Sequence, residues 1–145
     1  MAADILYYFE DLKEGMTATV ERVVTDADIK RFAECTGDYN PVHFDDAYAA
    51  TSVFKGRVCH GMLVASLIST TLGTKLPGPG TIYVVQNIRF KAPVRPGDRV
   101  AAQVTVAKLI TQKKFVEFKT RCLVGDKLVI EGEATGLIPS RVAAA

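Results

Sequence analysis

Residues 61–73 have the sequence GMLVASLISTTLG, which would be apolar on nearly every side of a helix. A helix of this kind is buried on most of its surface. Gly73 indicates where the helix ends, because glycine adopts the left-handed conformation common after a last turn. The run is shorter than the roughly 20 residues that a membrane-spanning helix needs. We therefore expect the central helix of a globular domain, and no membrane as a partner.

The segments on both sides of this helix have the patterns of β-strands. Residues 17–24 are rich in β-branched side chains, and apolar and polar residues alternate along 115–124. The other expected strands are 82–90, 99–110 and 127–137. A run of antiparallel strands with a helix to one side is typical of the α+β class. We predict an antiparallel sheet of about five strands wrapped around helix 61–73. Its open edges would be covered if two copies paired edge to edge, so we expect a homodimer.

A shorter helix is predicted between Thr25 and Gly37. Thr25 and Asp28 have the spacing of a capping box, in which each side chain binds the other residue's backbone N–H. Apolar residues follow at helical spacing, at Ile29, Phe32 and Ala33. Gly37 is placed to end this helix.

Composition limits the classes of function. The chain has 145 residues, of which 48% are hydrophobic and 23% charged, as expected for one globular domain spanning residues 1–145. The 18 basic and 16 acidic residues leave a net charge of +2. A nucleic-acid-binding surface needs a denser basic face, so we expect no nucleic acid as a partner.

Three cysteines, Cys35, Cys59 and Cys122, stand far apart in the chain. An odd number without a recurrent spacing argues against a disulfide framework and against a zinc site, so we expect no metal. Each is expected to be a small buried side chain. The first residues lack the basic and apolar regions of a secretory signal, which favours a cytoplasmic protein.

Residues 38–60 are a long, mostly irregular segment, and such segments in compact domains are often functional. Asp38 and His43 lie near its start, separated by Asn40 and Pro41, which favour a rigid turn. A carboxylate and an imidazole held toward one point can share acid and base work on one water molecule. Asn40 would orient the turn and the water. The alternative is that Asp38 only caps a turn and His43 only packs.

His60 and Gly61 stand where the central helix begins. The free N–H groups at a helix N-terminus favour anions and developing oxyanions, and glycine lets a carbonyl oxygen approach closely. Ser66, about one turn further, could line the same pocket. Alternatively, Gly61 and His60 serve only packing or capping, and the Ser66 hydroxyl bonds back to the helix.

Six basic residues could bind phosphate groups of a nucleotide-bearing ligand, and a solvated basic face is equally consistent with the pattern. They are Lys55, Arg57, Arg89, Lys91, Arg95 and Arg99.

The sequence TGDYNPVHFDDAYA at residues 36–49 resembles the signature of the R-specific enoyl-CoA hydratases of the MaoC-like dehydratase family. HGMLVAS at 60–66, FKAPV at 90–94 and PGD at 96–98 are also similar to that family. The resemblance extends from about residue 17 to residue 137 and is closest to the short bacterial members. It implies a hot-dog fold, in which a sheet wraps a long helix.

The resemblance also implies that Asp38 and His43 form a catalytic dyad and that residues 38–60 build the site. It places backbone near Gly61 at a thioester carbonyl and Ser66 beside the pocket. The implied reaction is reversible addition of water to trans-2-enoyl-CoA, giving R-3-hydroxyacyl-CoA for fatty-acid oxidation or polyhydroxyalkanoate synthesis. It requires no cofactor, because proton transfers and oxyanion stabilisation suffice. The alternatives are an acyl-CoA thioesterase on the same fold and a non-catalytic acyl-CoA-binding module.

Overall fold

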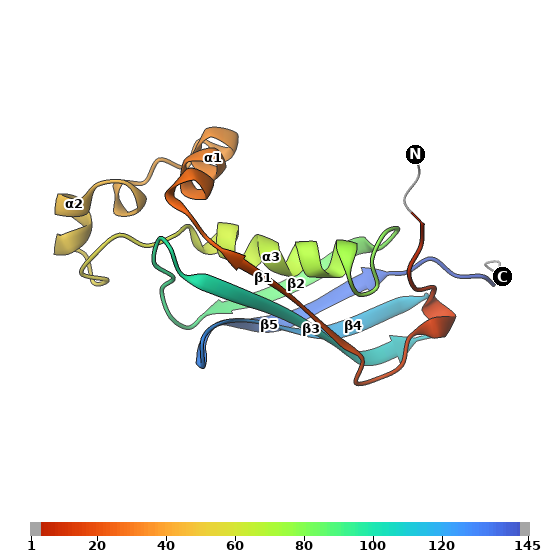
Figure 1. The fold of residues 1–145 in the computed structure, drawn as a ribbon. Coiled ribbons are helices and arrows are strands. Elements are labelled where there is room, and N and C mark those ends of the chain that lie inside the picture. The colour runs from red at the N-terminus through yellow and green to blue at the C-terminus, as the bar shows by residue number, and fades with distance from the viewer. Residues whose placement is uncertain (1–3, 143–145) are drawn as a thin grey trace.

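A computed structural model describes residues 4–142 of the chain (Figure 1). Its centre is one five-stranded sheet with strand order β1-β3-β4-β5-β2, in which every neighbouring pair is antiparallel. The strands are β1 (Thr17–Val23), β2 (Ile82–Phe90), β3 (Arg99–Ile110), β4 (Phe115–Val124) and β5 (Lys127–Leu137). The predicted sheet is therefore confirmed, and the strand bounds differ from the expectation by at most one residue.

The long helix α3 (Gly61–Thr74) lies along one face of this sheet (Figure 1) and contacts β1, β3 and β4. Its inward side is buried, with Ile68 and Val64 almost completely inaccessible. Its outward side is open in the single chain, and Met62 is 57% exposed. The prediction of burial on most sides is therefore wrong for the single chain, because the sheet covers only one side of the helix.

The sheet contributes its side of the core through strands in which buried and solvent-facing residues alternate. On β3 and β4, alternate residues point toward α3 and are buried, whereas their neighbours face solvent. The buried members are Val100, Ala102, Val104 and Val106 on β3, and Val116, Phe118, Thr120 and Cys122 on β4. Phe118, the largest of these, is 1% exposed.

The remaining helices gather at the N-terminal end of α3 (Figure 1). They are α1 (Asp26–Thr36), the 3₁₀ turn η2 (Pro41–His43) and α2 (Asp46–Thr51), while the 3₁₀ turn η1 (Phe9–Asp11) lies elsewhere. The predicted capping box of Thr25 and Asp28 is present, and Gly37 ends α1 with φ +81°. The segment 38–60 thus projects beyond the N-terminal end of α3.

Among the described residues, no helix is both long and apolar enough to cross a membrane. Cys59 and Cys122 are buried as expected. Cys35 is exposed, so the prediction that this side chain is buried is wrong. It lies two residues from the buried Ala33 on α1, which places it on the opposite side of that helix.

Candidate active site

A short turn connects Asp38 to His43. One carboxylate oxygen of Asp38 accepts the backbone N–H of Asn40 at 3.2 Å, and the Asn40 amide oxygen accepts that of Val42 at 3.3 Å. Pro41 then opens η2, where its missing N–H costs nothing. These local bonds fix the path between Asp38 and His43, as the sequence predicts.

His43 is buried, with 8% of its surface exposed. Its Nδ1 lies 2.8 Å from the carbonyl oxygen of Val58. A carbonyl can only accept, so Nδ1 carries the hydrogen and Nε2 has the lone pair of a base. Burial lowers the pKa of the imidazole, and the opposing effects of the Val58 carbonyl and the Asp38 carboxylate are smaller. The ring is therefore suited to accept a proton near neutral pH.

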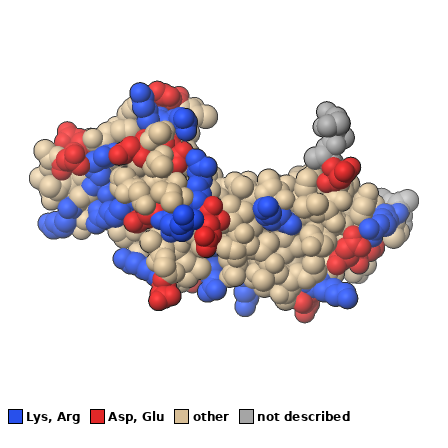
Figure 2. All heavy atoms as spheres, viewed as in Figure 1, with Lys and Arg blue, Asp and Glu red and all other residues tan. Residues whose placement is uncertain are grey.

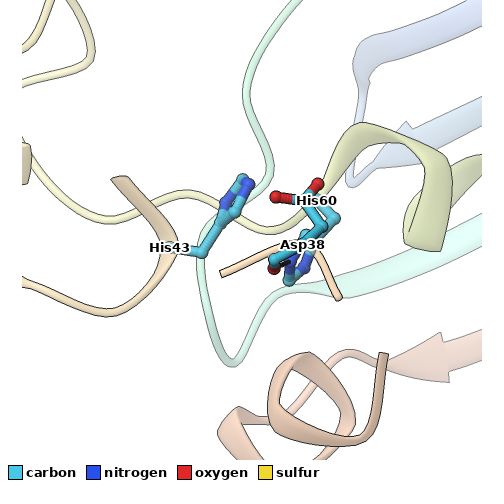
Figure 3. A group of neighbouring side chains, drawn as sticks. All are labelled: Asp38, His43 and His60. Atoms are coloured by element: carbon cyan, nitrogen blue, oxygen red, sulfur yellow. Dashed lines mark hydrogen bonds between the residues drawn. The ribbon is translucent and has the colours of Figure 1, made fainter. Parts of the chain in front are cut away.

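Asp38 and His43 come together, and His60 joins them. One carboxylate oxygen of Asp38 and one ring nitrogen of each histidine all lie within 4.8 Å of one another. Figure 3 shows the three side chains grouped beside the first turn of α3. The carboxylate belongs to an exposed residue, whereas both imidazoles are buried. A carboxyl group and an imidazole are thus within reach of the same small molecule.

A cavity of about 330 Å³ opens beside this group. Its lining is mostly apolar and includes His43, Val58, Gly61, Val64, Phe90 and Ile130. Gly61 is the first residue of α3, so its N–H has no acceptor within the helix. The cavity therefore has an imidazole and a helix N-terminus in its wall.

Ser66 is placed elsewhere. It is exposed and lines a different groove, together with Val20, Arg22 and Phe32. Its hydroxyl donates to the carbonyl of Leu63 at 2.5 Å, the back-bonding that the sequence left open as the alternative. Five residues along a helix correspond to a rotation of about 140°, so Ser66 and Gly61 face different directions. Asn40 is exposed and caps the turn.

Several of the basic residues hold the fold together instead of presenting free charges. Arg57 donates through Nε to the carbonyl of His43 at 2.8 Å and pairs with Asp26 of α1. Arg95 donates to the carbonyls of Arg57, at 3.1 Å, and Phe54. Other members pair with acidic side chains: Arg89 and Lys91 with Glu131, Arg89 also with Glu133, and Arg99 with Glu21. Lys91 is also part of the cavity lining.

The three clustered side chains have the chemistry of metal ligands but not the orientation. The rings of His43 and His60 are stacked, with centroids 3.8 Å apart and planes 32° apart. Imidazole lone pairs lie in the ring plane, and a zinc ion sits about 2.0–2.1 Å from each nitrogen. Nitrogens on two rings packed against each other in this way are poorly placed to converge on one ion. The arrangement favours proton transfer.

His60 is the residue whose position sequence reasoning missed. The sequence leaves packing or capping open as the alternative role of His60. Its ring is buried, and it is the N-cap residue of α3 without a side-chain capping bond. Its Nε2 instead lies 2.9 Å from the backbone carbonyl oxygen of Asp38. The pattern His-Gly at a helix start indicates a special N-terminus but contains no signal for a contact 22 positions away in the chain.

An antiparallel sheet packed on one long helix is the arrangement of the hot-dog fold, and the segment 38–60 lies beyond the start of that helix. Comparison with known families identifies the family within this fold. A family model described as "MaoC like domain" matches residues 9–136, and the chain belongs to that family.

Three relatives show how close the similarity is. The chain is 55% identical to an (R)-specific enoyl-CoA hydratase of Rhodospirillum rubrum, over 97% of this chain and 99% of the relative. The solved structure of the (R)-hydratase from Aeromonas caviae involved in PHA biosynthesis superposes with a TM-score of 0.86, at 40% identity over 90% of this chain and 99% of that one. An R-hydratase from Pseudomonas aeruginosa gives a TM-score of 0.87, at 39% identity over 97% and 92% of the two chains.

Proposed function

We propose that this protein is an R-specific enoyl-CoA hydratase, which adds water reversibly to trans-2-enoyl-CoA and forms R-3-hydroxyacyl-CoA. The observation that carries the proposal is the meeting of the Asp38 carboxylate and the His43 imidazole, beside an apolar cavity at the N-terminus of α3. The relatives named (R)-specific enoyl-CoA hydratase support the substrate class and the stereochemistry.

In this mechanism His43 is the base. Its Nδ1 is occupied by the Val58 carbonyl, so Nε2 is the nitrogen that takes a proton from water as the water oxygen bonds to C3. Asp38 takes part as the protonated carboxyl: it orients the water and gives its proton to C2, and the proton taken up by His43 then passes to the Asp38 carboxylate and restores the carboxyl. The net change is addition of H and OH across the double bond.

The thioester carbonyl makes C3 electrophilic, and negative charge develops on its oxygen during attack. The Gly61 N–H at the start of α3 stabilises that charge through a hydrogen bond and the helix dipole. The apolar lining takes the acyl chain. Asn40 contributes by holding the turn in shape. The reaction needs no cofactor, since CoA is part of the substrate.

We further propose that the protein acts as a homodimer joined through β2. This strand is an edge of the sheet, and large hydrophobic side chains are exposed along it, namely Ile82, Tyr83, Val84, Val85 and Phe90. Figure 2, in which β2 lies on the far side, shows charges interspersed over the end that contains α1 and α2 and few over the middle of the face in view. A long apolar edge of this kind is normally covered in the native assembly.

We also infer one domain spanning the chain and a cytoplasmic location. One sheet and one contiguous core account for the described residues. The three cysteines are free, which suits a reducing compartment.

The test is a spectrophotometric assay with crotonyl-CoA and with a longer trans-2-enoyl-CoA, together with thiol detection and chiral analysis of the product. Loss of enoyl absorbance without thiol release, and an R-configured product, are expected. Release of free CoA would instead indicate a thioesterase. Binding with neither signal would indicate a non-catalytic module, and an S-configured product would contradict the proposed stereochemistry.

A further inference from the structure

We propose that His60 is a positioning residue of the hydration site, which holds the Asp38 turn by a hydrogen bond and supports the His43 ring by stacking. This inference rests on the proposed hydratase function. His60 itself contacts neither the reacting water nor the acyl group in this assignment.

The side chain of His60 points at the turn instead of at its own helix. Although His60 is the N-cap of α3, its ring makes no capping bond there. Its Nε2 donates instead to the carbonyl oxygen of Asp38 at 2.9 Å. That bond ties the backbone of Asp38 directly to the start of the helix that supplies Gly61. The proposed acid, Asp38, and the proposed oxyanion-binding N–H of Gly61 are therefore held in a fixed position relative to each other.

The ring of His60 also supports the base. It is 2% exposed and lies between two aromatic neighbours, His43 at 3.8 Å and Phe32 at 4.7 Å between ring centroids. The Val58 carbonyl holds one edge of the His43 ring, and the face of His60 limits its tilt. Two contacts of different direction leave the His43 imidazole little freedom to rotate.

The hydrogen-bond pattern of His60 defines its protonation. A carbonyl acceptor requires a hydrogen on Nε2. Nδ1 is buried and has no partner among residues 4–142. The tautomer that supports Asp38 thus has its hydrogen on Nε2.

Two variants separate the hydrogen bond from the packing. His60→Gln keeps an N–H donor but removes the ring, and His60→Phe keeps a ring but removes the donor. Thr71→Val is the matched control, because Thr71 is a fully buried α3 residue whose hydroxyl bonds the carbonyls of Leu67 and Ala102, outside the site. Each is measured for kcat and KM with crotonyl-CoA and for melting temperature.

We expect His60→Phe to lose on the order of 10- to 100-fold in kcat with little change in KM, because small displacements of catalytic groups cost this much. His60→Gln keeps the hydrogen bond but not the ring, so it should lose kcat less than His60→Phe does, and Thr71→Val should lower the melting temperature without lowering kcat. Full activity in His60→Phe would overturn the proposal. Full activity in His60→Gln would overturn the stacking role, since the ring would then be dispensable.

A measurement on the unaltered protein remains decisive if His60→Phe does not fold. Long-range ¹H–¹⁵N correlation spectra report which nitrogen of each imidazole carries the hydrogen, and the chain has only two histidines. The expected result for His60 is hydrogen on Nε2 and none on Nδ1. The opposite tautomer would remove the bond to Asp38 and refute the positioning role. A wild-type protein without hydratase activity would refute the proposed function instead, and this spectrum would still test the geometry.

Discussion

The ring of Phe90 lies directly against the backbone of Gly61. A Cβ placed on Gly61 would be 2.7 Å from Cε1 of Phe90, closer than real Cβ contacts allow. In the single chain Phe90 is 55% exposed at the end of β2, which leaves its ring room to move away. Both residues line the cavity. The contact gives two explanations for glycine at this position, and they have different consequences.

If Gly61 serves catalysis, Gly61→Ala should reduce kcat/KM on the order of 10²-fold, because a methyl group would keep the thioester carbonyl from the helix N-terminus. The double variant Gly61→Ala with Phe90→Ala should remain equally impaired, since removing the ring does not remove the methyl group. Steady-state kinetics with crotonyl-CoA make the comparison, with Phe90→Ala alone as the control. Recovery in the double variant would assign Gly61 to packing only.

Removal of either member of the proposed acid–base pair should slow the reaction strongly. Asp38→Asn and His43→Gln should each lower kcat by about 10²–10⁴-fold, the usual loss for one general acid or base. Both substitutions preserve size, and circular dichroism should confirm that the variants fold. A fall of less than tenfold in both folded variants would rule out the pair.

The activity should be retained below neutral pH. Burial lowers the pKa of His43, so the neutral base persists to a lower pH than in an ordinary histidine with a pKa of 6.5. The acid limb of kcat/KM should therefore lie below pH 6.5. In the unfolded chain His43 has the ordinary, higher pKa, so below about pH 6.5 the unfolded state binds more protons than the folded state. The free energy of unfolding should therefore decrease as pH falls below about 6.5. This part of the decrease should be absent in His43→Gln, and an acid limb above pH 6.5 would contradict the assignment.

Arg57 should matter although it does not line the cavity. Its guanidinium joins the carbonyl of His43 to Asp26 on α1. Arg57→Lys retains the charge but cannot make both bonds in the same fork geometry. We expect kcat to fall on the order of tenfold or more as His43 loses its fixed position. Arg99→Lys, in an exposed pair with Glu21, is the control and should change kcat little.

A charge on the apolar edge should dissociate the proposed dimer. Val84 is 46% exposed on β2, and Val84→Arg would place an arginine in a self-paired edge. Light scattering after size-exclusion chromatography should show a dimer for the wild type and a monomer for the variant. Val23→Arg on the opposite edge strand, β1, should remain dimeric. Dissociation by Val23→Arg alone would assign the interface to β1.

The sequence could predict what depends on local pattern. The alternation along 115–124 and the Thr25–Asp28 spacing predicted β4 and the start of α1 almost to the residue, because period and capping are local properties. The Asp38–His43 turn was predictable for the same reason. Ser66 was not, because proximity in sequence to Gly61 does not determine the direction of a helical side chain.

The contacts that complete the site are non-local and gave no sequence signal. Only the folded chain brings His60 to the carbonyl of Asp38, or Arg95 to the carbonyls of Phe54 and Arg57. The exposed outer side of α3 was also unexpected, since composition alone cannot say how much of a helix one sheet covers. Pattern thus predicts the elements and the proposed acid–base pair, and tertiary packing determines which neighbours orient them.

The attachment of the 38–60 segment by Arg57 and Arg95 has a consequence for turnover. One arginine anchors the stretch near His43 to α1, and the other anchors its far part to the loop before β3. The loss of conformational freedom needed to align acid and base therefore occurs once, when the polypeptide folds. An incoming thioester meets groups already in register, and its own binding energy remains available for lowering the barrier.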